Sequence, residues 1–83
     1  MPTKKQFLSW AGYSSNHIIE ICECTYDEFG NIIDFATDSW DEDNLKNIPI
    51  NKVLHLNIMN RNYDKQEDIP FMINSNYQIV SAN

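Results

Sequence analysis

Eighty-three residues with a formal net charge of −6 form a short acidic chain, 42% hydrophobic and 12% aromatic. This composition is too apolar for a disordered acidic tail, and the length leaves room for a single domain over residues 1–83. The negative charge disfavours direct contact with nucleic acid or with an anionic membrane surface.

The first predicted element is a short helix over residues 3–11. Thr3 and Gln6 have the spacing of a capping box, which marks the start of a helix. A helix this short is not stable alone in water. We therefore expect it to dock on the rest of the domain, mainly through Phe7 and Trp10.

A β-hairpin is predicted next, with strands over residues 17–26 and 32–37. The intervening residues 27–31 include Gly30 and Asn31, which tolerate the positive φ angles of tight turns. Loops of two, three or four residues all fit this sequence, so the register stays open.

Residues 38–47 predict a second short helix. Ser39 and Glu42 form another capping-box pattern, acids follow in the first turn, and Pro49 ends the segment. We expect Trp40 to pin this helix to the sheet.

A central strand is predicted over residues 52–59. Three apolar residues at alternate positions line one face, and Val53 and Met59 lie on the other. So many apolar residues on both faces indicate cover on both sides.

The remaining chain is predicted as a polar loop over residues 60–68 and two strands over 69–73 and 77–81. Pro70 places the first of these at a sheet edge or at a strand beginning, because proline cannot donate to the ladder. Together the elements indicate an α+β fold: a small antiparallel sheet of four to five strands with one or two short helices.

The most distinctive pattern is a charge segregation over residues 6–45, which contain nine acids and no Lys or Arg. Such a region favours association with a basic surface. The alternative is that these acids have no partner-binding role and only solvate an exposed face or serve local turns and helix ends. The partner-binding residues predicted on the first interpretation are Glu20, Asp27, Glu28, Phe29, Asp34, Asp38, Asp41, Glu42 and Asp43.

Phe29 belongs to that set because it falls at the predicted hairpin tip among acids. An apolar ring presented there would act as a binding anchor. Alternatively, the hairpin folds back and buries the ring.

The cysteines and histidines do not predict a metal site. Cys22 and Cys24 are one residue apart, and His17 and His55 lack the close spacing of paired zinc ligands. The two cysteines are also too close along the chain for an easy disulfide. We expect reduced thiols, a satisfied core His55 and, with no apolar signal segment at the start, a cytoplasmic protein.

Catalytic motifs are not evident either. Two glycines in the whole chain leave little to build a phosphate or oxyanion loop, and so short a chain rarely frames a deep substrate cleft. We therefore expect a protein that is not an enzyme and needs no cofactor.

The sequence thus favours a small acidic inhibitor that occludes a basic, nucleic-acid-handling partner such as a nuclease, a restriction or CRISPR effector, or a toxin. Eleven Asn and eleven Ile indicate an AT-rich gene, as in many phages and mobile elements. A phage anti-defence protein that mimics nucleic acid, or the immunity protein of a nuclease toxin, fits these features. The alternatives are an assembly protein or homodimer that pairs through a strand edge after Pro70, and a small metal-binding domain.

Overall fold

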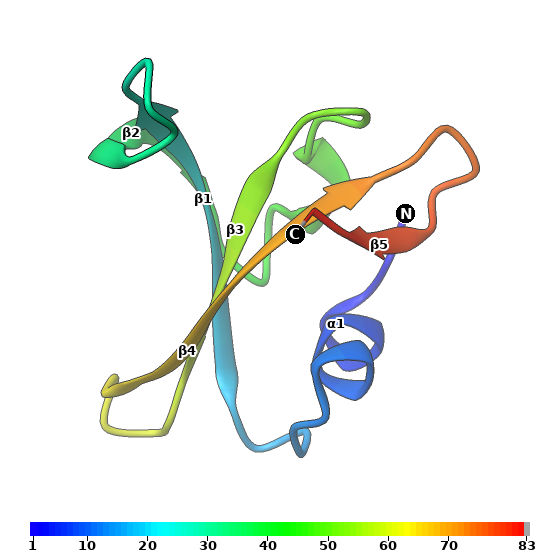
Figure 1. Cartoon of the computed structure of the whole chain (residues 1–83). Helices are drawn as coiled ribbons and strands as arrows, with labels where there is room; N and C mark the ends of the chain where they lie inside the picture. Colours follow the sequence, from blue (N-terminus) through cyan, green and yellow to red (C-terminus); the bar gives the residue numbers. More distant parts are fainter. Residues whose placement is uncertain (83) are drawn as a thin grey trace.

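A five-stranded antiparallel sheet that curves around one helix makes up the fold (Figure 1). The computed structural model describes the backbone of residues 1–82 and the side chains of residues 1–33 and 38–82. The predicted α+β class, with four to five antiparallel strands and one or two short helices, is confirmed. The elements in chain order are α1 (Lys4–Ala11), β1 (Ile18–Tyr26), β2 (Ile32–Trp40), the 3₁₀ turn η1 (Leu45–Asn47), β3 (Leu54–Met59), β4 (Lys65–Ile73) and β5 (Ile79–Ser81).

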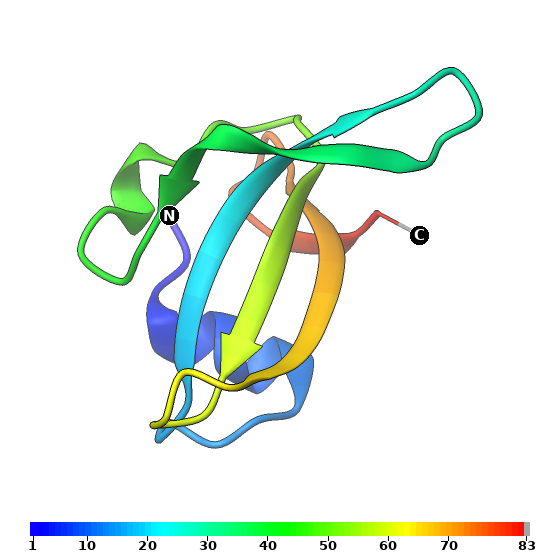
Figure 2. The same ribbon diagram turned by 90° about the vertical axis from the view of Figure 1, so that its left-hand side faces the viewer.

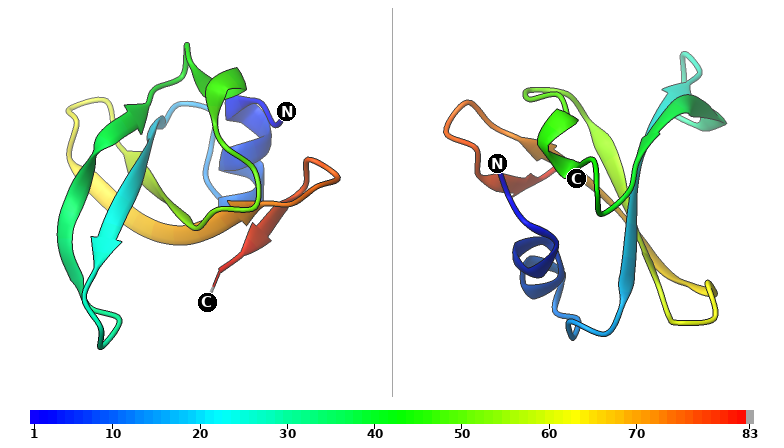
Figure 3. Two further views of the ribbon diagram at one scale, coloured as in Figure 1. Left: turned by 90° about the horizontal axis from the view of Figure 1, so that it is seen from above. Right: turned by 180° about the vertical axis from the view of Figure 1, so that it is seen from behind.

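The strands are ordered β2-β1-β3-β4-β5, and each neighbouring pair is antiparallel. Three pairs are hairpins of consecutive strands. The connection from β2 to β3 instead passes from the sheet edge to the far side of β1 and contains η1. This order places β3 in the middle, as predicted, with β2 and β5 at the edges. Seen from above, the sheet curls so that α1 lies against its concave side (Figure 3).

Local hydrogen bonds fix the start of α1. Thr3 Oγ1 accepts the Gln6 N–H at 3.2 Å and Gln6 Oε1 accepts the Thr3 N–H at 2.8 Å, so the predicted capping box is present. Phe7 is fully buried and meets the Phe71 ring edge-on, with 5.3 Å between centroids. Trp10 approaches the same ring but stays partly exposed, so Phe7 is the deeper of the two predicted anchors.

The core lies between α1 and the concave face of the sheet. Leu54, Leu56 and Ile58 alternate along β3 and are each 0% exposed, which confirms the predicted buried face. Leu45 and Ile48, in and just after η1, close one side of this core. Full burial of an aliphatic side chain of this size contributes roughly 1.5–3 kcal/mol to folding.

The other face of β3 carries polar rather than apolar side chains. Val53, predicted to lie there, precedes the strand and is exposed, and Met59 is only partly buried. His55 and Asn57, at 5% and 7% exposure, occupy the centre of this face. The prediction of an apolar second face is therefore wrong, because hydrogen bonds rather than apolar contacts cover it.

His55 is held by a carboxylate on one side and a phenol on the other. Its Nδ1 lies 2.7 Å from Asp68 Oδ1 on β4, and its Nε2 faces the hydroxyl of Tyr26 on β1. With Nδ1 protonated, His55 donates to Asp68 and accepts from Tyr26, so both ring nitrogens are satisfied as predicted. Burial and the nearby Cys24 and Asp68 raise the pKa of Tyr26, which keeps its hydroxyl protonated as a donor.

Three hairpin turns share one backbone geometry. In each, the fourth residue of the turn has a positive φ: 83° at Gly30, 63° at Tyr63 and 58° at Tyr77. The first residue accepts that residue's N–H through its carbonyl and two further backbone N–H groups through its side chain. These first residues are Asp27, Asn60 and Asn74. The first hairpin is thereby confirmed and its open register settled as a three-residue loop.

The predicted helix over residues 38–47 is wrong. Residues 38–40 instead extend β2, with Ser39 and Trp40 paired to β1, and Trp40 packs against the core from a strand. Asp41 Oδ1 accepts the Asp43 N–H at 2.9 Å and an amide hydrogen of Asn44 at 3.1 Å. This local turn competes with helix formation, so only η1 remains helical.

The polar loop predicted over residues 60–68 is also wrong in extent, because β4 already begins at Lys65. Pro70 does not begin the strand but lies within it, opposite His55. The Pro70 carbonyl accepts the Ala82 N–H at 3.2 Å. In an antiparallel strand the nitrogen and the carbonyl of one residue face the same neighbouring strand, so the Pro70 nitrogen also faces the β5 side. It lies just beyond the last residues that β4 and β5 pair. The missing N–H thus falls where β4 becomes a free edge, which reconciles proline with a mid-strand position.

The strained turns give a first prediction. We expect Tyr77→Gly to raise the free energy of unfolding by about 0.5–1 kcal/mol, because glycine adopts positive φ without steric strain. The measurement is the midpoint of urea unfolding, with Tyr77→Phe as a control that keeps both ring and strain. A lower midpoint for Tyr77→Gly would show that ring contacts outweigh the strain.

The imidazole contacts give a second prediction. Tyr26→Phe removes the hydrogen-bond partner of Nε2 on the buried His55 ring, and we expect a loss of about 1–3 kcal/mol in the free energy of unfolding. Tyr63→Phe removes a hydroxyl from an exposed side chain and should change it by less than about 0.5 kcal/mol. Equal effects of the two substitutions in urea unfolding would contradict a specific role for the Tyr26 hydroxyl.

Candidate partner-binding groove

A groove of about 370 Å³ opens where β2 ends beside β1. We call it the acidic groove. Its walls come from the start of β1, the segment after β2, the end of β3 and the β3–β4 turn. The lining residues are Ile18, Ile19, Glu20, Asp41, Glu42, Asp43, Met59 and Tyr63.

The groove exists because β2 pairs with only part of β1. The pairing begins at Ile21 opposite Trp40, and the chain then leaves β1 at Asp41. Residues 18–20 of β1 pair with β3 and have no partner on their other side among the described residues. The turn held by Asp41 follows directly after β2, and its acids line the same groove as Glu20.

The acids of the groove are only partly neutralised. Glu42 forms an ion pair with Lys4 at 2.8 Å. Glu20, Asp41 and Asp43 have no ion pair within the described side chains. Glu20 Oε1 accepts the Cys22 thiol hydrogen at 3.3 Å, which leaves its second carboxylate oxygen for other donors.

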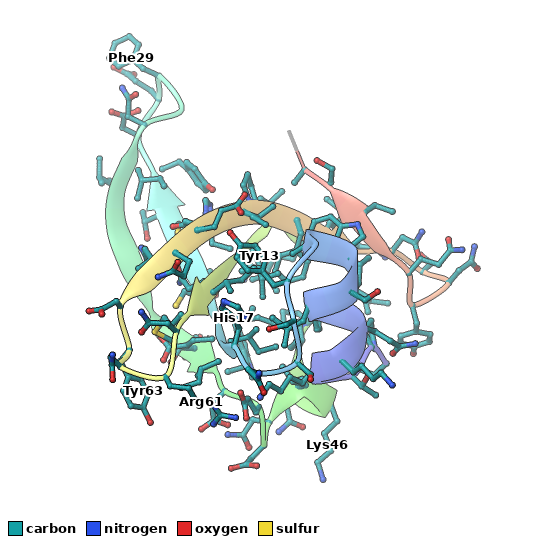
Figure 4. The ribbon with its side chains drawn as sticks, turned by 90° about the horizontal axis from the view of Figure 1, so that it is seen from below. Tyr13, His17, Phe29, Lys46, Arg61 and Tyr63 are labelled. Carbon is teal, nitrogen blue, oxygen red and sulfur yellow. The ribbon has the colours of Figure 1, made fainter. Side chains whose placement is uncertain are left out.

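Apolar groups line the rest of the groove. Ile18 and Met59 are paired residues of adjacent strands, and Tyr63 stands 71% exposed at the β3–β4 turn (Figure 4). A carboxylate rim over an apolar floor suits Lys or Arg, whose stem packs on apolar surface while the charged head meets anions. The Tyr63 ring adds a surface that attracts cations.

The predicted hairpin residues form a separate site. The β1–β2 hairpin projects beyond the sheet, and Phe29 at its tip is 81% exposed (Figures 2 and 4). The alternative in which the hairpin buries this ring is therefore wrong. Asp27 serves the turn itself, where backbone N–H groups of Asn31 and Phe29 hold the pKa of its carboxyl below the usual value. Glu28 beside it is exposed.

The nine predicted partner-binding residues are thus divided in the structure. Four of them line the acidic groove, and Asp27, Glu28 and Phe29 lie at the hairpin tip. Asp38 is exposed on β2, whereas the side chain of Asp34 lies outside the described residues.

Sequence reasoning missed the apolar half of the groove, Ile18, Met59 and Tyr63. Tyr63 fell in the segment predicted as a loop, although the pattern Asn-x-Asn-Tyr occurs at residues 60–63 and again at 74–77. That short repeat is the signal from which both turns could have been predicted.

The thiols of Cys22 and Cys24, on the neighbouring face of the sheet, have low reactivity. Burial and the hydrogen bond to Glu20 raise the pKa of Cys22 to about 11, and burial with nearby Asp68 raises the pKa of Cys24. Both are free and protonated at neutral pH, and thiolates are the nucleophilic and metal-binding form. Among the side chains of residues 1–33 and 38–82, no group of three or more His, Cys, Asp or Glu could hold a metal ion.

Comparison with protein-family models, curated proteins and solved structures found no match for this chain. Among the described residues, no helix has the length and apolar character needed to cross a bilayer.

Thiol reactivity tests this description of the sheet face. In Cys24→Ser, iodoacetamide at pH 8 should alkylate Cys22 about a hundredfold more slowly in the folded than in the urea-unfolded protein, because a pKa near 11 leaves far less thiolate than the ordinary 9.0. The rate is followed by mass spectrometry, with N-acetylcysteine as the reference for reagent activity in urea. Similar rates in the folded and unfolded protein would contradict a protonated, buried thiol.

Proposed function

We propose that this protein is an inhibitor that binds a basic, nucleic-acid-handling protein and occludes the surface that partner uses. The observation that carries the proposal is the acidic groove, which is lined by four acidic residues together with apolar side chains. Duplex DNA carries about one negative charge per 1.7 Å of axis, and the proteins that grip it present Lys and Arg in response. A folded protein with convergent carboxylates competes for those same side chains.

The distribution of charge over the chain supports association steered by electrostatics. The basic residues with ion pairs engage acids of their own chain: Lys4 with Glu42, Lys52 with Glu23 and Lys65 with Asp68. The chain still has a net charge of −6, and the carboxylates of Glu20 and Asp43 form no ion pair within the described side chains. Such a field accelerates encounter with a positive surface.

The hairpin supplies a second point of contact in this proposal. Phe29 projects an aromatic ring that no core contact holds, and Glu28 beside it is exposed. Desolvation of one such ring in a partner pocket is typical of the few residues that dominate interface energy. Steering by the groove and anchoring by Phe29 are then separate contributions.

The groove suits a protein side chain better than a substrate. Its volume is near the lower limit of roughly 300–1,000 Å³ for small-molecule pockets, and the neighbouring Cys22 is protonated at neutral pH. This favours a binding protein that needs no cofactor over an enzyme. An anti-restriction or anti-CRISPR protein of a phage, and the immunity protein of a nuclease toxin, both work in this way.

Self-assembly through a strand edge is the second candidate, and one observation favours it. The projecting hairpin exposes Tyr26, Ile32 and Ile33 next to the free edge of β2. Pairing of two such edges would bury these side chains. The acids on and beside β2 oppose it, because two copies would place like charges together.

A pull-down from lysate of the source cells at low and high salt tests the inhibitor proposal. The groove variant Glu20→Gln/Asp43→Asn and the control variant Glu23→Gln/Glu67→Gln each remove two charges, and the control residues lie outside both the groove and the hairpin tip. We expect wild type and control to retain one nucleic-acid-handling protein at low salt and to release it at high salt, because exposed charges are screened within about 8 Å at physiological ionic strength. The groove variant should lose most of this protein already at low salt, because two of the carboxylates that attract it are gone.

The purified pair then gives the decisive comparison. Its association rate should fall with rising salt for the wild type and much less for the groove variant. Equal retention by all three proteins at both salt concentrations would contradict the proposal. A mass that increases with protein concentration, independent of salt, would favour self-assembly.

A further inference from the structure

A second hollow of about 270 Å³ adjoins the acidic groove on the polar face of the sheet. It is lined by Glu20, Cys22, Asn57, Met59 and Lys65, and it shares Glu20 and Met59 with the groove. We call these two adjoining hollows together the channel, which is bordered by the acids after β2, by Glu20 and Met59, and by Asn57 on the polar face.

An incompletely bonded amide lies at the inner end of this channel. Asn57 is 7% exposed, and its Nδ2 donates to Cys22 Sγ at 3.3 Å. Its Oδ1 is buried and has no hydrogen-bond partner among the described residues. Nearly all buried polar side-chain atoms in folded proteins have a partner, so an acceptor left over here points to a donor from another molecule.

Rotating the Asn57 amide by half a turn, which exchanges Oδ1 and Nδ2, still leaves one of these atoms without a hydrogen-bond partner. Oδ1 would then face Cys22, whose thiol hydrogen is already given to Glu20, and Nδ2 would be the atom without a partner. The local hydrogen bonds therefore cannot satisfy both atoms of the amide in either orientation.

Two acceptors stand side by side at this point. Glu20 on β1 and Asn57 on β3 are directly paired residues, so their side chains leave the sheet about 5 Å apart. A carboxylate and an amide oxygen at this spacing match a planar group that carries several N–H donors on one edge. The guanidinium of arginine has five such donors in a fixed fork, whereas the lysine ammonium is a compact point charge.

The remaining walls are compatible with an arginine side chain. The aliphatic stem would lie over Met59, and Tyr63 borders the outer groove. Asn57 Oδ1 is buried in the free protein, so we expect Met59 and Lys65, which line the same hollow, to move aside on binding. Both are long and unbranched, and the Lys65 ammonium lies 3.6 Å from Asp68 on its own strand.

From these contacts we infer that the channel is a recognition site for one arginine side chain of the partner, with its guanidinium between Glu20 and Asn57. This deepens the proposed function and rests on it, since it names the residue type that the acidic groove selects. The acidic residues alone would accept either cation, and the buried acceptor of Asn57 adds the preference for arginine.

The test is an NMR titration of uniformly ¹⁵N-labelled protein with N-acetyl-arginine methylamide and, separately, N-acetyl-lysine methylamide. The two compounds carry the same charge. We expect arginine to shift the side-chain amide signals of Asn57 and the backbone signals of residues 18–20 and 57–59. Half-saturation should need at least about fivefold less arginine than lysine, which corresponds to about 1 kcal/mol.

Two variants test the contribution of individual side chains to arginine binding. Glu20→Gln replaces one side chain at the rim and should weaken arginine binding severalfold, whereas Lys65→Gln removes a like charge from the wall and should strengthen it. Glu67→Gln on β4, which lines neither hollow, is the matched control and should leave the titration unchanged. Unaltered arginine binding by Glu20→Gln would overturn the inference.

The outcomes also separate this inference from the proposed function. Equal shifts by both compounds, without movement of the Asn57 amide, would overturn the arginine site while leaving a groove that accepts cations. The absence of shifts with either compound would overturn the site as well. A salt-dependent partner in the pull-down would then show that the inhibitor proposal survives through another surface.

Discussion

Burial of β3 on both faces is the constraint on which the rest of the structure depends. One face is aliphatic, and α1 and the segment around η1 cover it with apolar contacts. The other face carries His55 and Asn57, which must find hydrogen-bond partners because water is excluded. His55 obtains both of its partners from adjacent strands, whereas Asn57 obtains only one. The hydrogen bonds on this polar face are therefore complete around His55 and incomplete at Asn57.

The sequence predicted the features that depend on local chemistry. The capping box at Thr3, the turn at Gly30 and the alternation from Leu54 to Ile58 each arise within a few residues. The second helix failed where two local signals compete: Ser39 can cap a helix, but Asp41 closes a turn and β1 offers a pairing edge. Among the site residues, the acids could be predicted one by one. Their convergence could not, because it depends on how far β2 follows β1 and on Tyr63 arriving from a distant turn.

The acids of the chain have two kinds of environment, and this bears on the choice between solvation and recognition. Asp27, Glu23, Glu42 and Asp68 are engaged by turns or by basic groups of the same chain. Such acids serve the fold and would be expected in any small acidic domain. Glu20 and Asp43 lie at a concave surface without a cationic partner within the described side chains. Mutual repulsion there opposes folding slightly, and a bound cation would relieve it.

The three matching hairpin turns also determine how this chain reaches its fold. Each turn closes a strand pair across three residues, so three of the four pairings form between neighbours in sequence. The fourth, between β1 and β3, must bring together segments separated by residues 27–53. Loop closure of that length carries the largest entropy loss in the sheet. We therefore expect the β1–β3 pairing to be the slow step of assembly, and the acidic groove and the adjoining hollow, which are both lined by residues of β1 and β3, to form late in folding.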